Sequence, residues 1–169
     1  MATSPELLQS APDVVIRPMT ETDVGGVVAL ERGAYQFPWS EGIFRDCLRV
    51  GYTCRVATSA NRLIGYGVMS VGAGEAHILN LCIDEGFRCQ GIGKRMLEYL
   101  LDKGAAAGMS EAFLEVRPSN TAAIRLYLSL GFDQVGMRRG YYQAVGGRED
   151  AAVLKLALRG RRGRSTPRE

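Results

Sequence analysis

The feature that most constrains the fold is a glycine-rich turn between an apolar run and a helix-like run. The turn reads Arg-Cys-Gln-Gly-Ile-Gly-Lys over residues 88–94, after a strand-like run at 76–83 and before a helix-like run at 95–103. A turn that opens a helix leaves backbone N–H groups without partners, and the helix dipole adds partial positive charge there. The sequence therefore predicts a site for a phosphate-bearing ligand, with an ordinary strand-to-helix turn as the alternative.

Two common phosphate-binding loops do not fit this turn. The third glycine of a dinucleotide-binding fingerprint would fall at Met96, and a P-loop needs Ser or Thr where Arg95 follows Lys94. Both nucleotide-binding interpretations are excluded, so the rest of the chain has to indicate the ligand.

Hydrophobic periodicity predicts one mixed α/β domain. We expect one helix after a cap at residues 20–23 and a second after a cap at Ser40. A third helix should run from about 91 to 107, and a fourth from about 120 to Gly131. The strand at 76–84, the helix after it and the strand at 112–117 should form a βαβ unit with parallel strands. The seven expected strands are 14–19, 53–58, 63–71, 76–84, 112–117, 135–142 and 151–158.

The positive charge of the chain is concentrated at its end. Residues 159–169 hold five arginines and one glutamate, which leaves 16 basic and 17 acidic residues in 1–158. We therefore expect a nearly neutral domain at 1–158 and a disordered arginine-rich tail at 159–169. The tail is either a solvated terminus or a weak contact for RNA.

Composition excludes several classes of protein. The chain is 46% hydrophobic and 23% charged, and it holds no apolar run near the ~20 residues that span a membrane. Residues 1–11 do not resemble a secretory signal, so a cytoplasmic protein with reduced thiols is expected. No metal is expected, because His77 is the only histidine and Cys47, Cys54, Cys82 and Cys89 lack zinc-ligand spacing.

The loop and its place between a strand and a helix resemble the acetyl-CoA loop, Arg/Gln-x-x-Gly-x-Gly/Ala, of the GNAT superfamily of N-acetyltransferases. The resemblance implies a GNAT fold, with a mixed, mostly antiparallel sheet of about seven strands and about four flanking helices. It also implies that backbone amides from Cys89 to Lys94 hold the pyrophosphate. The cofactor contacts implied in this way are Leu81, Cys82, Ile83, Arg88, Cys89, Gln90, Gly91, Ile92, Gly93, Lys94, Asn120 and Tyr127.

Within that superfamily, further stretches resemble the RimI type, the ribosomal-protein alanine N-acetyltransferases. The match extends over about 14–158, and Cys89 and Glu85 depart from it where a basic residue and a proline are usual. The stretches are Phe-Pro-Trp-Ser at 37–40, Asn-Leu-Cys-Ile-Asp at 80–84, and the segments 114–120, 126–132, 139–142 and 147–151.

The resemblance assigns two catalytic roles. It makes Glu115 the acceptor of the amine proton, directly or through a water, although a strand glutamate paired with Arg117 or Arg125 fits the residues equally well. It makes Tyr127 the proton donor to the CoA sulfur, because a phenol with a pKa of ~10 keeps its proton; a core tyrosine is the alternative.

The oxyanion contact and the transfer route follow from the same strand. Backbone N–H groups near Cys82 or Ile83 would polarise the thioester oxygen. An acyl-enzyme on Cys82 is disfavoured, because the nearest base, His77, is five residues away in a strand and is expected on the opposite face.

The acceptor amine is predicted from its acidity. Deprotonating an α-amine costs ~3 kcal/mol less than deprotonating a lysine, so a single carboxylate base suits an N-terminus better. Aromatic residues that either line a peptide slot or pack the helices are Tyr35, Phe37, Trp39, Tyr141 and Tyr142.

The RimI resemblance implies direct transfer from acetyl-CoA to the N-terminal alanine of the small-subunit ribosomal protein S-eighteen, by a monomer or weak dimer. The alternatives are a GNAT enzyme that acts on lysines or small amines, and a non-catalytic acetyl-CoA-binding module tethered to RNA by its tail.

Overall fold

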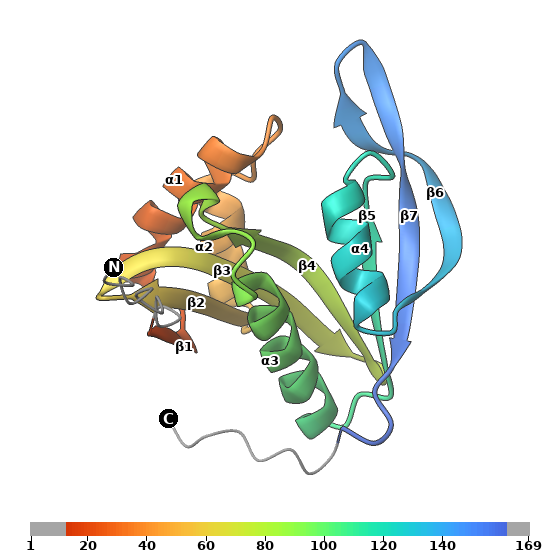
Figure 1. The fold of residues 1–169 in the computed structure, drawn as a ribbon, viewed down its shortest axis with the longest axis horizontal. Helices are drawn as coiled ribbons and strands as arrows, with labels where there is room; N and C mark the ends of the chain where they lie inside the picture. The colour runs from red at the N-terminus through yellow and green to blue at the C-terminus, as the bar shows by residue number, and fades with distance from the viewer. Residues whose placement is uncertain (1–12, 162–169) are drawn as a thin grey trace, which may run out of the picture.

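The computed structural model describes residues 13–161, which form one seven-stranded mixed sheet with helices packed on it (Figure 1). The strand order is β1-β2-β3-β4-β5-β7-β6, and the β4–β5 pairing is the parallel one. The strands are β1 Val14–Pro18, β2 Thr53–Ser59, β3 Arg62–Gly72, β4 Glu75–Ile83, β5 Glu111–Val116, β6 Asp133–Ala144 and β7 Gly147–Ala157. The helices are α1 Val24–Ala34, α2 Glu41–Arg49, α3 Ile92–Ala106 and α4 Thr121–Ser129, with short 3-10 turns at Glu21–Asp23 and Glu85–Phe87. The predicted mixed sheet and its parallel βαβ unit are confirmed.

The helices cover the sheet with two hydrophobic clusters. The larger one is built on α3, whose Met96, Leu97, Leu100 and Leu101 are fully buried at helical spacing. The smaller one joins α1 and α2 to β2–β4 and has Phe44 at its centre. Ser40 caps α2 as predicted, since its Oγ accepts a hydrogen bond from the Ile43 N–H at 3.3 Å.

Strands β4 and β5 pair over only part of their length. The parallel pairing runs from Glu75 and Glu111 to Ile78 and Leu114, after which β4 continues to Ile83 and the two strands diverge (Figure 1). Each half of the sheet keeps its own neighbours beyond that point, because β4 stays paired with β3 and β5 stays paired with β7. The sheet is therefore open on one side along its middle.

A β-bulge at Leu79 changes which face of β4 each side chain occupies. Val68 of β3 is opposite Asn80 and Met69 is opposite Ile78, so Leu79 is an extra residue in β4. Leu79 packs into the α1–α2 cluster, and Asn80 also points to that side, where it contacts α1. The alternation is thereby inverted, and His77 and Cys82 share a face of β4. The prediction that they lie on opposite faces is wrong.

The β6–β7 hairpin is longer than the sequence predicted. Its strands run to Ala144 and Gly147 with only two residues between them, whereas the predicted ends were 142 and 151. The outer part of β7 pairs with β6 alone, since the contact with β5 begins at Ala152. The hairpin tip thus extends past the sheet and forms one side of its opening (Figure 1).

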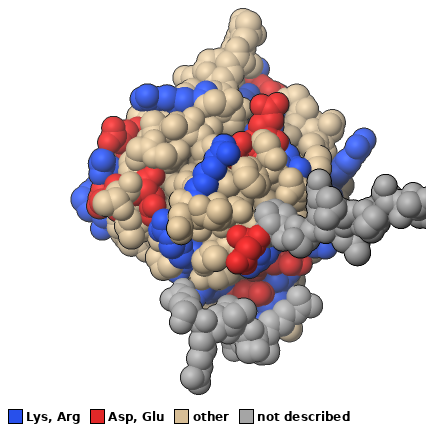
Figure 2. All heavy atoms as spheres, turned by 60° about the vertical axis from the view of Figure 1, so that its left-hand side comes forward, with Lys and Arg blue, Asp and Glu red and all other residues tan. Residues whose placement is uncertain are grey.

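Charged side chains of both signs are interspersed over the face drawn in Figure 2, among many uncharged residues. This distribution fits the nearly neutral charge counted for residues 1–158. In the described part of the chain, no helix is long and apolar enough to span a membrane.

The close approach of β3 to the end of β4 gives a test of the packing. A Cβ on Gly65 would lie 2.6 Å from Ile83 Cδ1 and 2.9 Å from the Cys82 carbonyl oxygen, and that backbone oxygen cannot move aside easily. We expect Gly65→Ala to lower the free energy of unfolding by about 1–3 kcal/mol, measured by urea denaturation. The matched control, Gly25→Ala, places its methyl in open space on α1 and should raise it by about 0.5–1 kcal/mol. Equal stability of the two variants would contradict this packing.

Candidate active site

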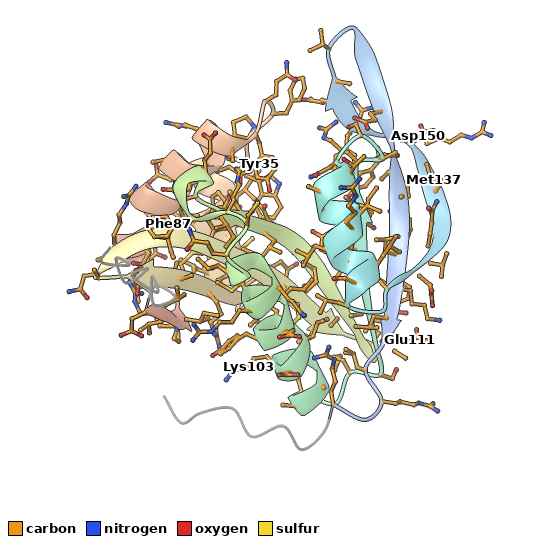
Figure 3. The ribbon with its side chains drawn as sticks, viewed as in Figure 1. Tyr35, Phe87, Lys103, Glu111, Met137 and Asp150 are labelled. Atoms are coloured by element: carbon orange, nitrogen blue, oxygen red, sulfur yellow. The ribbon has the colours of Figure 1, made fainter. Side chains whose placement is uncertain are left out.

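A cleft of about 490 Å³ opens where β4 and β5 diverge. Its walls come from the end of α1 and the loop after it on one side, and from α4 and the β6–β7 hairpin on the other. Figure 3 shows Tyr35 and Asp150 on these two opposite sides. The predicted site residues that line the cleft are Tyr35, Phe37, Trp39, Leu81, Glu115, Asn120, Tyr127 and Tyr142.

The glycine-rich turn is outside this cleft, at the start of α3. Gly91 adopts a left-handed conformation with φ of +79°, and Cys89 does so with φ of +62°. None of the backbone amides from 89 to 94 donates a hydrogen bond to another group in the described residues; the first that does is that of Arg95, which donates to the Gly91 oxygen at 3.0 Å. These unpartnered amides at a helix N-terminus fit a bound pyrophosphate.

Arg88 and the end of β4 connect the turn to the cleft. The Arg88 Nε donates to the Ile83 carbonyl at 3.1 Å, which fixes the arginine against the strand. At the cleft, the Tyr35 hydroxyl donates to the Leu81 carbonyl at 2.7 Å. Burial raises the pKa of Tyr35, so the hydroxyl keeps the proton that it donates. The Leu81 carbonyl therefore already has a partner on the side where the resemblance places the pantetheine arm.

Glu115 lines the cleft with both carboxylate oxygens in contact with basic side chains. Its Oε2 is 2.5 Å from His77 Nε2 and its Oε1 is 3.2 Å from Arg138 Nε. Burial raises the pKa of Glu115, but the hydrogen bond to His77 and the charges of His77 and Arg138 outweigh it, so the pKa is below its ordinary value. Glu115 is thus a carboxylate at neutral pH. Its partners differ from those of the alternative prediction, Arg117 or Arg125, and Arg117 pairs with Glu149 at 3.2 Å instead.

Tyr127 lies on α4 and Asn120 directly precedes that helix, on the opposite wall of the cleft from β4. The Tyr127 ring packs edge-on against Phe132 at 5.9 Å between ring centroids, and burial raises the pKa of Tyr127 to about 12. Tyr127 is therefore a partly buried ring that packs against the core, with a protonated hydroxyl. The Asn120 side chain caps α4, since its Oδ1 accepts from the Ala123 N–H at 3.2 Å.

Some of the predicted aromatic residues pack against the core, and others are exposed at the cleft. Trp39 is partly buried and packs on Phe44 with 5.4 Å between ring centroids, whereas Tyr35 and Phe37 are more than a third exposed. Across the cleft, Tyr142 is stacked under the Arg117 guanidinium at 4.4 Å. Tyr141 is exposed beside it and does not line the cleft. Cys82 and Ile83 also lie outside the cleft lining.

Comparison with known proteins identifies the family of this chain. The model of the acetyltransferase (GNAT) family matches residues 25–132. The chain belongs to the GNAT acetyltransferase family. It is 36% identical over 143 residues to the [ribosomal protein bS18]-alanine N-acetyltransferase of Escherichia coli K12, and that match covers 85% of this chain and 97% of the relative. The Haemophilus ducreyi protein of the same name is 34% identical over 145 residues, covering 85% of this chain and all of the relative.

Solved structures agree with the sequence comparison. The crystal structure of the Escherichia coli enzyme has a TM-score of 0.80 and 34% identity, covering 92% of this chain and 97% of that one. Ard1 from Thermoplasma volcanium has a TM-score of 0.78 and 26% identity, covering 85% and 97%. This GNAT protein is therefore an acetyl-CoA-dependent N-acetyltransferase, as predicted. In residues 13–161, no cluster of His, Cys, Asp and Glu is arranged to hold a metal ion.

Glu31 is a residue of the cleft that the sequence did not indicate as part of the site. Its side chain is buried inside this GNAT domain and accepts hydrogen bonds from the Tyr66 hydroxyl, from Asn80 Nδ2 at 3.0 Å and from the Trp39 N–H at 2.9 Å. The Trp39 contact anchors the loop that forms one cleft wall, and the Asn80 contact anchors the bulged part of β4. Its spacing after Val24, Val27 and Val28, which places it on the buried face of α1, is a signal in the sequence that could have identified it.

We expect Glu31→Ala to destabilise the fold and to loosen the loop at 35–39. Three donors would lose a buried acceptor, so the free energy of unfolding should fall by at least about 2 kcal/mol, measured by urea denaturation. Limited proteolysis should then cut within the loop. The matched control, Glu41→Ala on α2, removes an exposed pair with Arg45 and should cost less than about 1 kcal/mol. A Glu31→Ala variant as stable as this control would refute the anchoring role.

Proposed function

We propose that this enzyme acetylates the α-amine of an N-terminal alanine, with ribosomal protein bS18 as its substrate, by direct transfer in a ternary complex. The observation that carries the proposal is a single cleft lined by both Glu115 and Tyr127, a carboxylate and a protonated phenol, beside a helix N-terminus with unpartnered amides. The relatives that are named bS18-alanine N-acetyltransferases support the choice of substrate, since they match over nearly their whole length.

The backbone around α3 holds the cofactor in this proposal. The amides of residues 89–94 bind the pyrophosphate, and Arg88 is held in place beside them by the Ile83 carbonyl. Residues Leu81–Ile83 run beside the pantetheine arm, and a backbone N–H near Cys82 or Ile83 polarises the thioester oxygen. Acetyl-CoA supplies the acetyl group as a thioester: the amine nitrogen bonds to the acetyl carbon, the C–S bond breaks, and CoA leaves as a thiolate.

The two catalytic side chains move the protons. Glu115 accepts the proton of the incoming ammonium group, directly or through a water, and so supplies the neutral amine. Tyr127 gives its hydroxyl proton to the sulfur of the departing CoA, and the second nitrogen proton, lost as the amide forms, restores the hydroxyl. Glu115 belongs to β5 and Tyr127 to α4. In this proposal the substrate amine enters between these two side chains from the open side of the sheet.

The walls of the cleft are suited to a peptide N-terminus. The loop residues Tyr35 and Phe37 and the hairpin residue Tyr142 offer aromatic surface on both sides. Carboxylates outnumber basic groups in the lining, with Glu31, Glu115 and Glu149 against Arg117. A positively charged α-ammonium group is attracted to such a cleft. Trp39 contributes mainly by packing, and Tyr141 supports Tyr142 through an edge-on ring contact at 4.8 Å.

The arginine-rich tail makes a weak contact with ribosomal RNA in this proposal. The enzyme is proposed to be a monomer or weak dimer. Residues 162–169 lie outside the described part of the chain. The first residues of the tail touch the domain, because Arg161 Nη1 donates to Asp102 Oδ1 at 2.9 Å.

Mass spectrometry of acetylated peptides tests the acceptor. We expect acetyl-CoA and a peptide with the N-terminal sequence of bS18 to give a product acetylated on the N-terminal nitrogen, at a rate at least about 100-fold above that of a lysine-bearing peptide with a blocked N-terminus. The reason is the lower cost of deprotonating an α-amine. Equal or faster acetylation of the lysine peptide would support the alternative acceptor class and contradict the proposal.

Two substitutions test the proton-transfer roles. Tyr127→Phe removes the donor and should lower kcat by about 100-fold or more, with the KM for peptide little changed.

Glu115→Gln should lower kcat most at low pH, where more of the amine is protonated and needs a base. Since the pKa of Glu115 is below its ordinary value, the wild-type carboxylate stays ionised in mildly acidic solution. Steady-state rates that match the wild type for either variant would remove the role assigned to that residue.

A further inference from the structure

His77 contacts Glu115 from outside the cleft. Its Nε2 is 2.5 Å from Glu115 Oε2, and its side chain is 33% exposed while that of Glu115 is 6% exposed. Glu115 lines the cleft and His77 does not. The contact depends on β4 and β5 being paired at this level, where His77 is opposite Phe113, two residues before Glu115. Glu115 therefore lies between the reacting amine and a partly exposed imidazole.

We propose that His77 is a positioning residue for Glu115 and that its charge sets the strength of Glu115 as a base. This inference rests on the proposed role of Glu115 as the acceptor of the amine proton. An imidazole with its proton on Nε2 donates the same hydrogen bond to Oε2 whether the ring is neutral or charged. The carboxylate is held in one place in both states, and only the positive charge beside it changes.

The sign of the effect follows from the charges around the carboxylate. A positive charge within ~4–6 Å makes a carboxylate a weaker proton acceptor, and Arg138 supplies one such charge at every pH. Protonated His77 adds a second. Imidazole changes charge within the neutral pH range, so Glu115 should become more basic as the pH rises and His77 loses its proton.

The other titratable groups near the pair come from β5, β6 and β7. Arg138, Tyr141 and Tyr142 of β6 face Glu115, and both tyrosines have a raised pKa, chiefly through burial, so they stay neutral up to pH 9. Further along the same face of β5, Glu111 pairs with Lys155 of β7 at 2.9 Å. Within this group, His77 is the one imidazole.

The contact itself is tested by NMR without any assay of activity. His77 is the only histidine in the sequence, so its ring signals in the untagged full-length protein need no assignment. We expect its titration midpoint to fall in Glu115→Gln, because the imidazolium loses its anionic partner. An unchanged midpoint would overturn the proposal.

The functional part is tested by comparing His77→Gln and His77→Phe with the wild type. Glutamine keeps an N–H donor and carries no charge, whereas phenylalanine has neither. The ratio of kcat for His77→Gln to that for the wild type should rise roughly threefold or more from pH 9 to pH 6, while KM for peptide stays constant. Protonation of the substrate amine affects both proteins equally and cancels in this ratio. His77→Phe should be slower than His77→Gln at every pH.

A ratio that does not change with pH, or a His77→Gln variant no faster than His77→Phe, would overturn the proposal. Unfolding curves and acetyl-CoA affinity show whether each variant is folded. If no alanine peptide is acetylated, the proposed function fails while the NMR titration still decides the His77–Glu115 contact. If the peptide is acetylated and the ratio stays flat, only the role of His77 fails.

Discussion

The partial pairing of β4 and β5 is the constraint on which the site depends. Four residue pairs, from Glu75–Glu111 to Ile78–Leu114, hold the two halves of the sheet together, and beyond them each strand keeps only its outer neighbour. Backbone groups along the inner edges then lack a strand partner, which is unfavourable in a closed core and useful in a cleft. The opening forms the cleft that Glu115 of β5 lines, and in the proposed function acetyl-CoA and a peptide N-terminus meet there.

The bulge at Leu79 determines what faces that opening. With strict alternation, Asn80 and Cys82 would point to the α3 side of the sheet; with the bulge, Asn80 reaches Glu31 of α1 instead. Glu31 also accepts a hydrogen bond from the Trp39 N–H in the loop at 35–39. The extra residue Leu79 therefore lets β4 contact, through Glu31, the loop that forms one wall of the cleft. His77, just before the bulge, keeps the register that places it beside Glu115. Asn80, which follows the bulge at Leu79, thus contacts Glu31, and His77, which precedes it, contacts Glu115.

Much of the fold and part of the site could be predicted from the sequence. The glycine turn, its flanking apolar runs and the parallel βαβ unit follow from local patterns, and the unpartnered amides at residues 89–94 are where these patterns predicted them. The inversion at Leu79 could not be predicted, because a bulge leaves no composition signal and a one-residue shift moves every later side chain to the other face. The contacts of His77 and Arg138 with Glu115 link three strands distant in sequence, so no spacing rule reveals them.

The surroundings of Glu115 also bear on which amine the site can use. A carboxylate in contact with two basic side chains is a weak base, and the substrate has to make up the difference in acidity. An α-ammonium group, with a pKa of ~8, is about 2.4 units easier to deprotonate than a lysine, which corresponds to about 3 kcal/mol or roughly a 250-fold difference in the fraction of neutral amine. A stronger base would reduce the importance of this difference. In the proposed mechanism, the same contacts that hold Glu115 in place favour N-termini over lysine side chains, before any contact with the alanine methyl or the rest of the peptide contributes.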